Sequence, residues 1–236
     1  LVFKSSYVQT VICKKIGNHL SKKSETTITI SEVDFRPFDT FVLKDLLILD
    51  HQKDTMLFSN DFYFEINDYN FKNLDFNFDL VELNEAYLNI KTYKNENQSN
   101  LTRFINKLSR KDSLKKKKTP KINIKEIQFE ELRCKIWNEN IPINYKTTDF
   151  NHLELSGVNM DAFDFSFKDN TIKVNTELLA FKEKYGLEIL RMSGELKMSN
   201  KELVVKHLEV ETNETDIHGD VSLNYENFNA FNNFFK

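Results

Sequence analysis

The chain has 236 residues, a formal net charge of −3, and 40% hydrophobic against 29% charged residues. This balance is too apolar for a disordered chain and provides no basic footprint for a nucleic-acid partner. Only 5 glycines and 3 prolines are present, so the chain has little material for the glycine-rich loops that cradle phosphates or form oxyanion nests. Composition therefore argues against catalysis.

The first predicted element is an amphipathic helix from Tyr7 to about Lys22, within residues 1–25. Its apolar positions recur at helical spacing and leave polar and basic residues on the other side. They are Val8, Val11, Ile12, Ile16 and Leu20. Such a helix packs on a sheet or lies at a membrane surface.

From residue 26 the hydrophobic period changes to two, which is typical of strands with one apolar and one polar face. Three segments show the alternation most clearly, and their aromatic residues are the candidate binding residues. These are Phe62, Phe64, Phe76, Phe78, Phe163, Phe165 and Phe167. For each of them, simple core packing is the competing interpretation.

A finer pattern, apolar-x-apolar-x-x-apolar-x-apolar, recurs along the chain. It occurs at 28–35, 41–48, 81–88, 122–129, 153–160 and 203–210. The pattern predicts two short strand pieces separated by a bulge or corner that keeps both apolar pairs on one side. Stacked pieces of this kind form an elongated, curved sheet.

Residues 95–120 interrupt the pattern with a short predicted helix, Leu101–Leu108, and a Lys-rich linker before Pro120. We expect this excursion to divide one continuous sheet into residues 26–94 and 121–236. The Lys115–Lys118 run is typical of a solvated linker, because no aromatic residues interleave with it. Contact with anionic lipid head groups is the alternative.

No catalytic, metal-binding or cofactor-binding motif is present. The five histidines are dispersed, and the pair on candidate neighbouring strands, His207 and His218, is more typical of surface residues than of metal ligands. Cys13 and Cys134 are read as two buried thiols, with a single disulfide as the alternative. We expect neither an enzyme nor a cofactor.

The apolar sheet face needs a cover, because large exposed apolar areas are rare in soluble monomers. Two sheets packed face to face would form an ordinary sandwich core. A single sheet curved into an open trough would instead hold lipid acyl chains. Periodicity alone favours the sandwich.

Four segments resemble TamB-type proteins of the AsmA-like superfamily. Ser5–Phe35 leads into Phe41–Asn67 and is similar to the region after the membrane anchor of these proteins. Met198–Phe231, with apolar pairs, a Thr-rich corner and Gly219–Asp220, is similar to another recurrent segment, and Ser99–Leu108 fits the family's helical excursions. The resemblance covers most of the chain, through degenerate apolar spacings rather than invariant chemistry.

The resemblance implies a periplasmic protein of a diderm bacterium, anchored in the inner membrane by a segment preceding this chain. It implies a β-taco groove that conducts phospholipids between the two membranes. Because the phenylalanines alternate on one face, we expect the seven named above to contact the acyl chains in such a groove. A C-terminal domain beyond this chain would engage an outer-membrane barrel of the BamA/TamA kind. These are expectations carried by the family.

Two other functions stay open. One is a scaffold or assembly factor for outer-membrane proteins, whose exposed strand edges pair with client strands. The other is an enzyme on a β-sandwich, which no residue constellation supports.

Overall fold

A computed structural model of the chain describes residues 21–22, 24–36, 40–70, 75–109, 121–145 and 149–226. Within them the protein is mainly β, with one large mixed sheet of twelve strands and a single short helix. The predicted helix from Tyr7 to Lys22 and the Lys115–Lys118 run lie outside the described residues, apart from helical turns at Ser21 and Lys22. The short excursion helix is confirmed as α2, Asn100–Ser109.

The strands follow the predicted apolar segments. Those before α2 are β1 (Thr27–Thr29), β2 (Glu32–Arg36), β3 (Thr40–Leu49), β4 (Thr55–Asn70), β5 (Asp75–Asn84) and β6 (Tyr87–Thr92). Those after it are β7 (Lys121–Asn138), β8 (His152–Lys168), β9 (Thr171–Glu183), β10 (Glu188–Met198), β11 (Glu202–Thr212) and β12 (Asp216–Asn224).

The sheet is continuous across the excursion, as the sequence predicts. Its order is β1-β3-β4-β5-β7-β8-β9-β10-β11-β12, with β2 beside β3 and with β6 beside β4 and β7. Strands β5 and β6 pair with β7 in parallel, and the other neighbours are antiparallel. Parallel pairing requires a long crossover, and α2 lies within the one that leads from β6 to β7. All described strands belong to this sheet, so they do not form the predicted alternative of a two-sheet sandwich.

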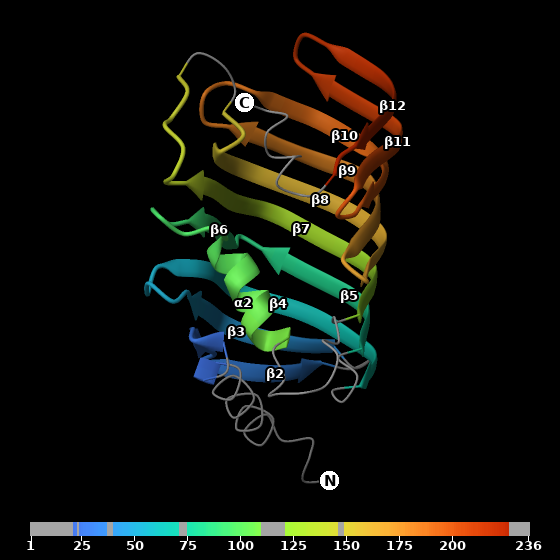
Figure 1. Cartoon of the computed structure of the whole chain (residues 1–236). Helices are drawn as coiled ribbons and strands as arrows, with labels where there is room; N and C mark the ends of the chain where they lie inside the picture. Colours follow the sequence, from blue (N-terminus) through green and yellow to red (C-terminus); the bar gives the residue numbers. More distant parts are fainter. Residues whose placement is uncertain are drawn as a thin grey trace.

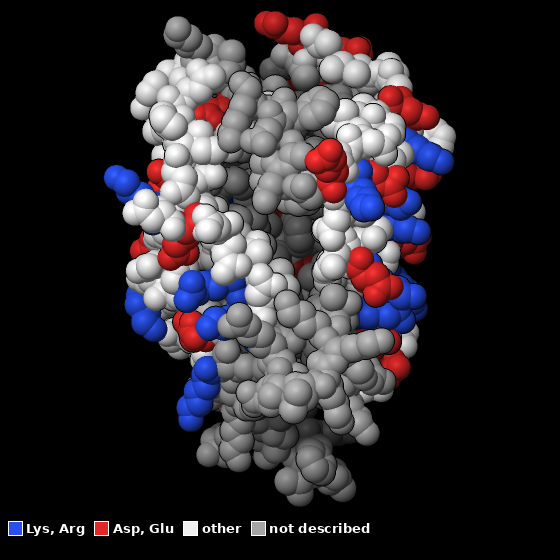
Figure 2. All heavy atoms as spheres, in the orientation of Figure 1, with Lys and Arg blue, Asp and Glu red and all other residues white. Residues whose placement is uncertain are grey.

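The sheet is strongly curved, and its concave face is turned toward the viewer in Figure 1, with α2 in front of β3 and β4. In the same orientation, Figure 2 shows the molecule hollowed between two walls whose flanks carry charges of both signs. The described atoms that border the hollow are mostly uncharged.

Backbone corners account for the curvature. At four of the predicted double spacers, the second spacer residue has a left-handed φ of 48–55°, as at Asp45, Glu85, Gly157 and His207. Glu131 and Asp164 repeat the geometry between the apolar pairs Phe129/Leu132 and Ala162/Phe165. A left-handed residue bends the strand and shifts the alternation of its side chains by one residue. The apolar residues before and after it therefore face the same side of the sheet.

The core lies along these corners. The apolar residues that flank Asp45, Leu43 and Leu46, are buried in one cluster, and Leu83 and Ala86, which flank Glu85, are buried in a second. The second cluster also contains Leu132 and Val158, each next to a left-handed residue in its own strand. Burial of these pairs offsets the cost of the left-handed backbone, which is about 1–2 kcal/mol for a non-glycine residue.

The corner at Gly157 offers a direct test of this backbone constraint. A Cβ added there meets nothing closer than Glu131 Oε2 at 3.8 Å, so Gly157→Ala introduces strain without a clash. We expect it to lower the free energy of unfolding by about 1 kcal/mol in urea titrations. Glu131→Gly, which relieves strain at the neighbouring corner, is the control and should change stability by less than about 0.5 kcal/mol. Equal destabilisation by both would contradict the corner model.

Candidate functional site

An uninterrupted row of apolar residues crosses the concave face from β2 to β12. Each member is the direct cross-strand partner of the next, so all of them face the same side of the sheet. The row consists of Val33, Leu43, Phe62, Leu83, Phe129, Met160, Leu179, Met192, Val210 and Ile217. With neighbouring strands about 4.8 Å apart, this first row is about 40 Å long.

A second row runs parallel to the first, nearer the other end of the strands. It consists of Phe76, Ile122, Phe167, Ile172, Met198, Leu203 and Leu223, again partner to partner. Between the rows, Ile124 on β7 is flanked by Phe78 on β5 and Phe165 on β8. The concave face is therefore apolar both along and across the strands.

The structure brings together the phenylalanines predicted on β4 and β5. The ring centroids of Phe62 and Phe64 are 5.4 Å apart, and Phe64 meets Phe78 edge-on at 6.2 Å. Phe41, which the candidate set did not include, stacks on Phe64 with centroids 5.2 Å apart. On β8, Phe165 packs beside the buried cluster of Ile127, Ala162 and Val174. Contact of these residues with lipid stays a prediction.

Phe163 departs from the predicted alternation. It pairs with Glu126 and Asn175, one position away from the inward-facing Ala162. The left-handed residue Asp164 then adds one position before Phe165. The register therefore places Phe163 on the opposite, convex face from Phe165 and Phe167.

The large rings of the concave face are only partly covered. Every phenylalanine whose side chain the structure describes keeps some exposure, and the largest fully buried side chains are instead His152, Val33 and Val42. A closed sandwich core of this composition would bury its phenylalanines completely. The face is thus apolar, ordered and partly open.

A buried hydrogen-bonded pair, Asp149 and His152, fastens the loop between β7 and β8 at the rim of the sheet. His152 is 1% exposed, and its Nδ1 lies 2.8 Å from Asp149 Oδ2 while Nε2 lies 2.9 Å from the Asn138 carbonyl oxygen. Burial acts to raise the pKa of Asp149, yet hydrogen bonds from backbone N–H groups and from His152 hold it below the usual 3.8.

This depressed pKa of Asp149 predicts a defined pH dependence. Its stabilising contribution is fully present above the unfolded-state pKa near 3.8 and is lost as pH falls through the lower folded-state value. Asp149→Asn should therefore destabilise the protein by about 1–3 kcal/mol at pH 7, with the difference from the parent shrinking below about pH 4. Urea unfolding across this range measures the effect, with exposed Asp169→Asn as the control. A difference that is independent of pH would refute the assignment.

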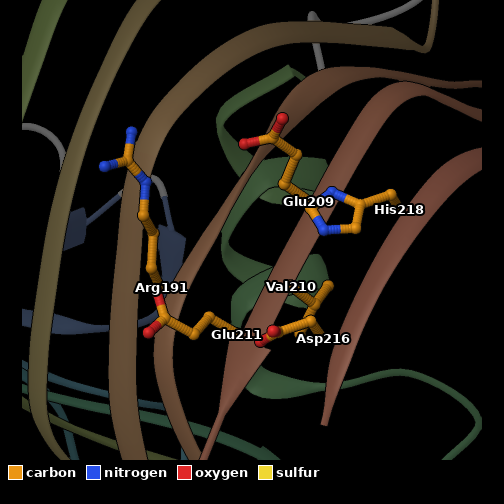
Figure 3. A pocket seen from close by; sticks show the side chains of 6 residues that line it. All are labelled: Arg191, Glu209, Val210, Glu211, Asp216 and His218. Atoms are coloured by element: carbon orange, nitrogen blue, oxygen red, sulfur yellow. The ribbon is translucent and has the colours of Figure 1, made fainter.

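The convex face is charged. A hollow of about 180 Å³ on β10–β12 is lined by five charged or ionisable residues together with Val210, a member of the first row. The five are Arg191, Glu209, Glu211, Asp216 and His218, and Figure 3 shows the hollow with α2 behind the sheet. The guanidinium of Arg191 does not point toward the carboxylates. Within the described ranges, no group of three or more His, Cys, Asp or Glu side chains is placed to hold a metal ion.

The structure also describes one cysteine and both histidines singled out in the sequence. Cys134 is a free thiol, and burial raises its pKa to about 11, while Cys13 lies outside the described residues. A thiol with that pKa is inert at neutral pH. His207 and His218 lie on the paired strands β11 and β12, as predicted, with His207 Nδ1 3.4 Å from Glu195.

Sequence reasoning missed most of the first row. Phe129, Met160 and Val210 are members of the recurrent double-spacer pattern, which was the available signal, but Leu179 and Met192 belong to segments without it. Their alignment depends on the register between strands, which periodicity within one strand does not reveal.

Comparison of the chain with family models, curated proteins and solved structures finds no match. Among the described residues, no helix is both long and apolar enough to cross a membrane. The geometry of the concave face is therefore the basis for inferring function.

Proposed function

We propose that the concave face of this sheet is a groove that holds phospholipid acyl chains, and that the chain is part of a bridge-like protein that conducts lipids. The observation that carries the proposal is the first row, ten apolar partners in direct succession from β2 to β12. Because the row crosses the strands, an acyl chain that moves along it meets similar apolar contacts at each strand.

The energetics suit passage better than tight binding. An acyl chain that enters the groove from water gains about 0.8 kcal/mol per buried methylene. Relative to a bilayer, which is equally apolar, the net free energy is near zero. Side chains such as Met160 and Met192 adapt to different chain positions at little cost, and no charged partner holds a head group within the row.

The resemblance of Ser5–Phe35, Phe41–Asn67 and Met198–Phe231 to TamB-type proteins supports the same proposal and extends it. On this basis the protein acts in the periplasm of a diderm bacterium, between an inner-membrane anchor and an outer-membrane barrel of the BamA/TamA kind. Anchor and barrel contacts would lie outside the present chain. The proposed activity is passive and non-enzymatic.

A second candidate function, a scaffold that pairs with client strands, is favoured by one observation. Within the described residues, β12 pairs with β11 alone, and its inward side chains Ile217, Val221 and Leu223 continue the apolar face. An added strand would extend the sheet there. Under this alternative, a charge placed in the groove leaves function intact.

Two phenylalanines of β8 provide a matched test, since Phe165 faces the groove and Phe163 the convex side. We expect Phe165→Asp to weaken phospholipid binding at least about tenfold, because a charge in the apolar face costs more than 1.4 kcal/mol. Phe163→Asp should bind within about twofold of the parent. Native mass spectrometry with lipid extraction measures the bound phospholipid.

Circular dichroism of both variants checks the fold, and Phe165→Ala, which adds no charge, should bind lipid less tightly than the parent. Equal binding by Phe165→Asp and Phe163→Asp, with both folded, would contradict the groove. So would a folded parent protein that carries no phospholipid and takes none up from vesicles.

A further inference from the structure

Helix α2 covers the beginning of the first row. It lies on the concave face in front of β3 and β4 in Figure 1, and its Phe104 packs against a buried cluster of the sheet. The cluster consists of Ile28, Val33, Leu43 and Leu46, with Phe62 and Phe64 at its margin. Val33, Leu43 and Phe62 are the first three members of the row, so the ring of Phe104 occupies the surface on which the row begins.

The N-terminal end of α2 is anchored by buried hydrogen bonds. Asn100 is 1% exposed, and its Nδ2 donates to Asp50 Oδ2 and to the Asn89 carbonyl oxygen, each at 3.0 Å. Its Oδ1 accepts from the backbone N–H of Lys91 at 2.9 Å. Asp50 is equally buried and also accepts from the Tyr93 hydroxyl at 2.7 Å. Breaking this network would leave several buried polar groups unsatisfied, so this end stays attached.

The following turns of α2 are held at the surface. Arg103 Nη2 lies 3.3 Å from Glu25 Oε2, and Lys107 contacts the other carboxylate oxygen of the same half-exposed side chain. Exposed ion pairs of this kind are weakened by water and salt. Moreover, Arg103 Nε is enclosed without an acceptor among the described residues. The covered position of α2 therefore leaves a buried donor unsatisfied, which lifting the helix would return to water.

We infer that Phe104 occupies an acyl-chain subsite at the start of the first row, and that a lipid chain competes with α2 for it. This inference rests on the proposed function. It identifies the beginning of the first row as a part of the groove that Phe104 of α2 occupies. A methylene chain can make dispersion contacts with the same buried cluster that Phe104 packs against. The helix then lifts about Asn100, because the buried bonds lie at that end.

Competition predicts that weakening the covered state tightens lipid binding, since apparent affinity scales with the fraction of open molecules. Phe104→Ala removes the competing ring, and Glu25→Lys keeps the ring but repels Arg103 and Lys107. Titrated with NBD-labelled phosphatidylethanolamine, both should bind about three- to tenfold more tightly than the parent. Ile105→Ala, on the same turn and 41% exposed, is the matched control and should bind as the parent does.

Hydrogen exchange gives a second readout that does not depend on mutations. A ten-residue helix is marginal away from the sheet, so the labelled lipid should speed exchange of the amides from Arg103 to Ser109. Parent affinity in both Phe104→Ala and Glu25→Lys, weaker binding by Phe104→Ala, or unchanged exchange of α2 with lipid would each overturn the competition.

The Phe165→Asp variant separates this inference from the proposed function. If it abolishes binding of the labelled lipid while the α2 variants match the parent, the groove stands and the competition fails. If the folded parent binds no labelled lipid, the proposed function fails, and the competition fails with it.

Discussion

The left-handed corners within the strands are the constraint on which the rest of the structure depends. At Asp45, Glu85, Glu131 and Gly157 one residue leaves the extended conformation, and the strand bends while its apolar residues stay on one side. The register between strands shifts at several of these corners, yet apolar residues still pair directly across the strands and form rows. The same corners hold the buried core, in which Leu43, Leu83 and Leu132 lie.

Rows of this kind distinguish the concave face from an ordinary core. A core buries its largest side chains against a second layer, whereas here the phenylalanines stay partly exposed and the fully buried positions carry smaller residues such as Val33 and Ala86. The charged convex face, with hollows lined by residues such as Arg191 and Glu209, has the composition of a solvated surface. A one-sided sheet of this kind fits an apolar occupant that moves along it.

Helix α2 shows how the protein covers part of that face without closing it. Phe104 fills one place, while Asn100 fixes the helix at the end where polar groups are buried. The two ends of the helix are held with unequal strength, because one is held by buried hydrogen bonds and the other by exposed ion pairs. Buried hydrogen bonds to Asp50 are costly to lose, whereas exposed pairs with Glu25 are not. A ligand that competes for the apolar place therefore has a defined way to displace the helix.

Several features of this architecture could be predicted from the sequence, because they are local. The double-spacer pattern marks the corners at Asp45 and Gly157, and the break before Leu101 marks the excursion helix. Alternation with Phe165 predicts that Phe163 faces the groove as well, whereas the left-handed residue Asp164 between them shifts the register with β9 and turns the two side chains to opposite sides. The rows and the position of α2 depend on pairings between distant strands, which a single sequence does not specify.

The most direct measurement is photocrosslinking of the full chain with a phospholipid that carries a diazirine in its acyl chain, followed by mapping of the labelled residues. The first row predicts labels on Phe129, Met160, Leu179 and Met192. Their neighbours on the convex side should stay unlabelled, above all Leu178, which is as apolar as Leu179 and pairs with Asp161. Labels spread equally over Leu178 and Leu179, or confined to the convex face, would contradict the account.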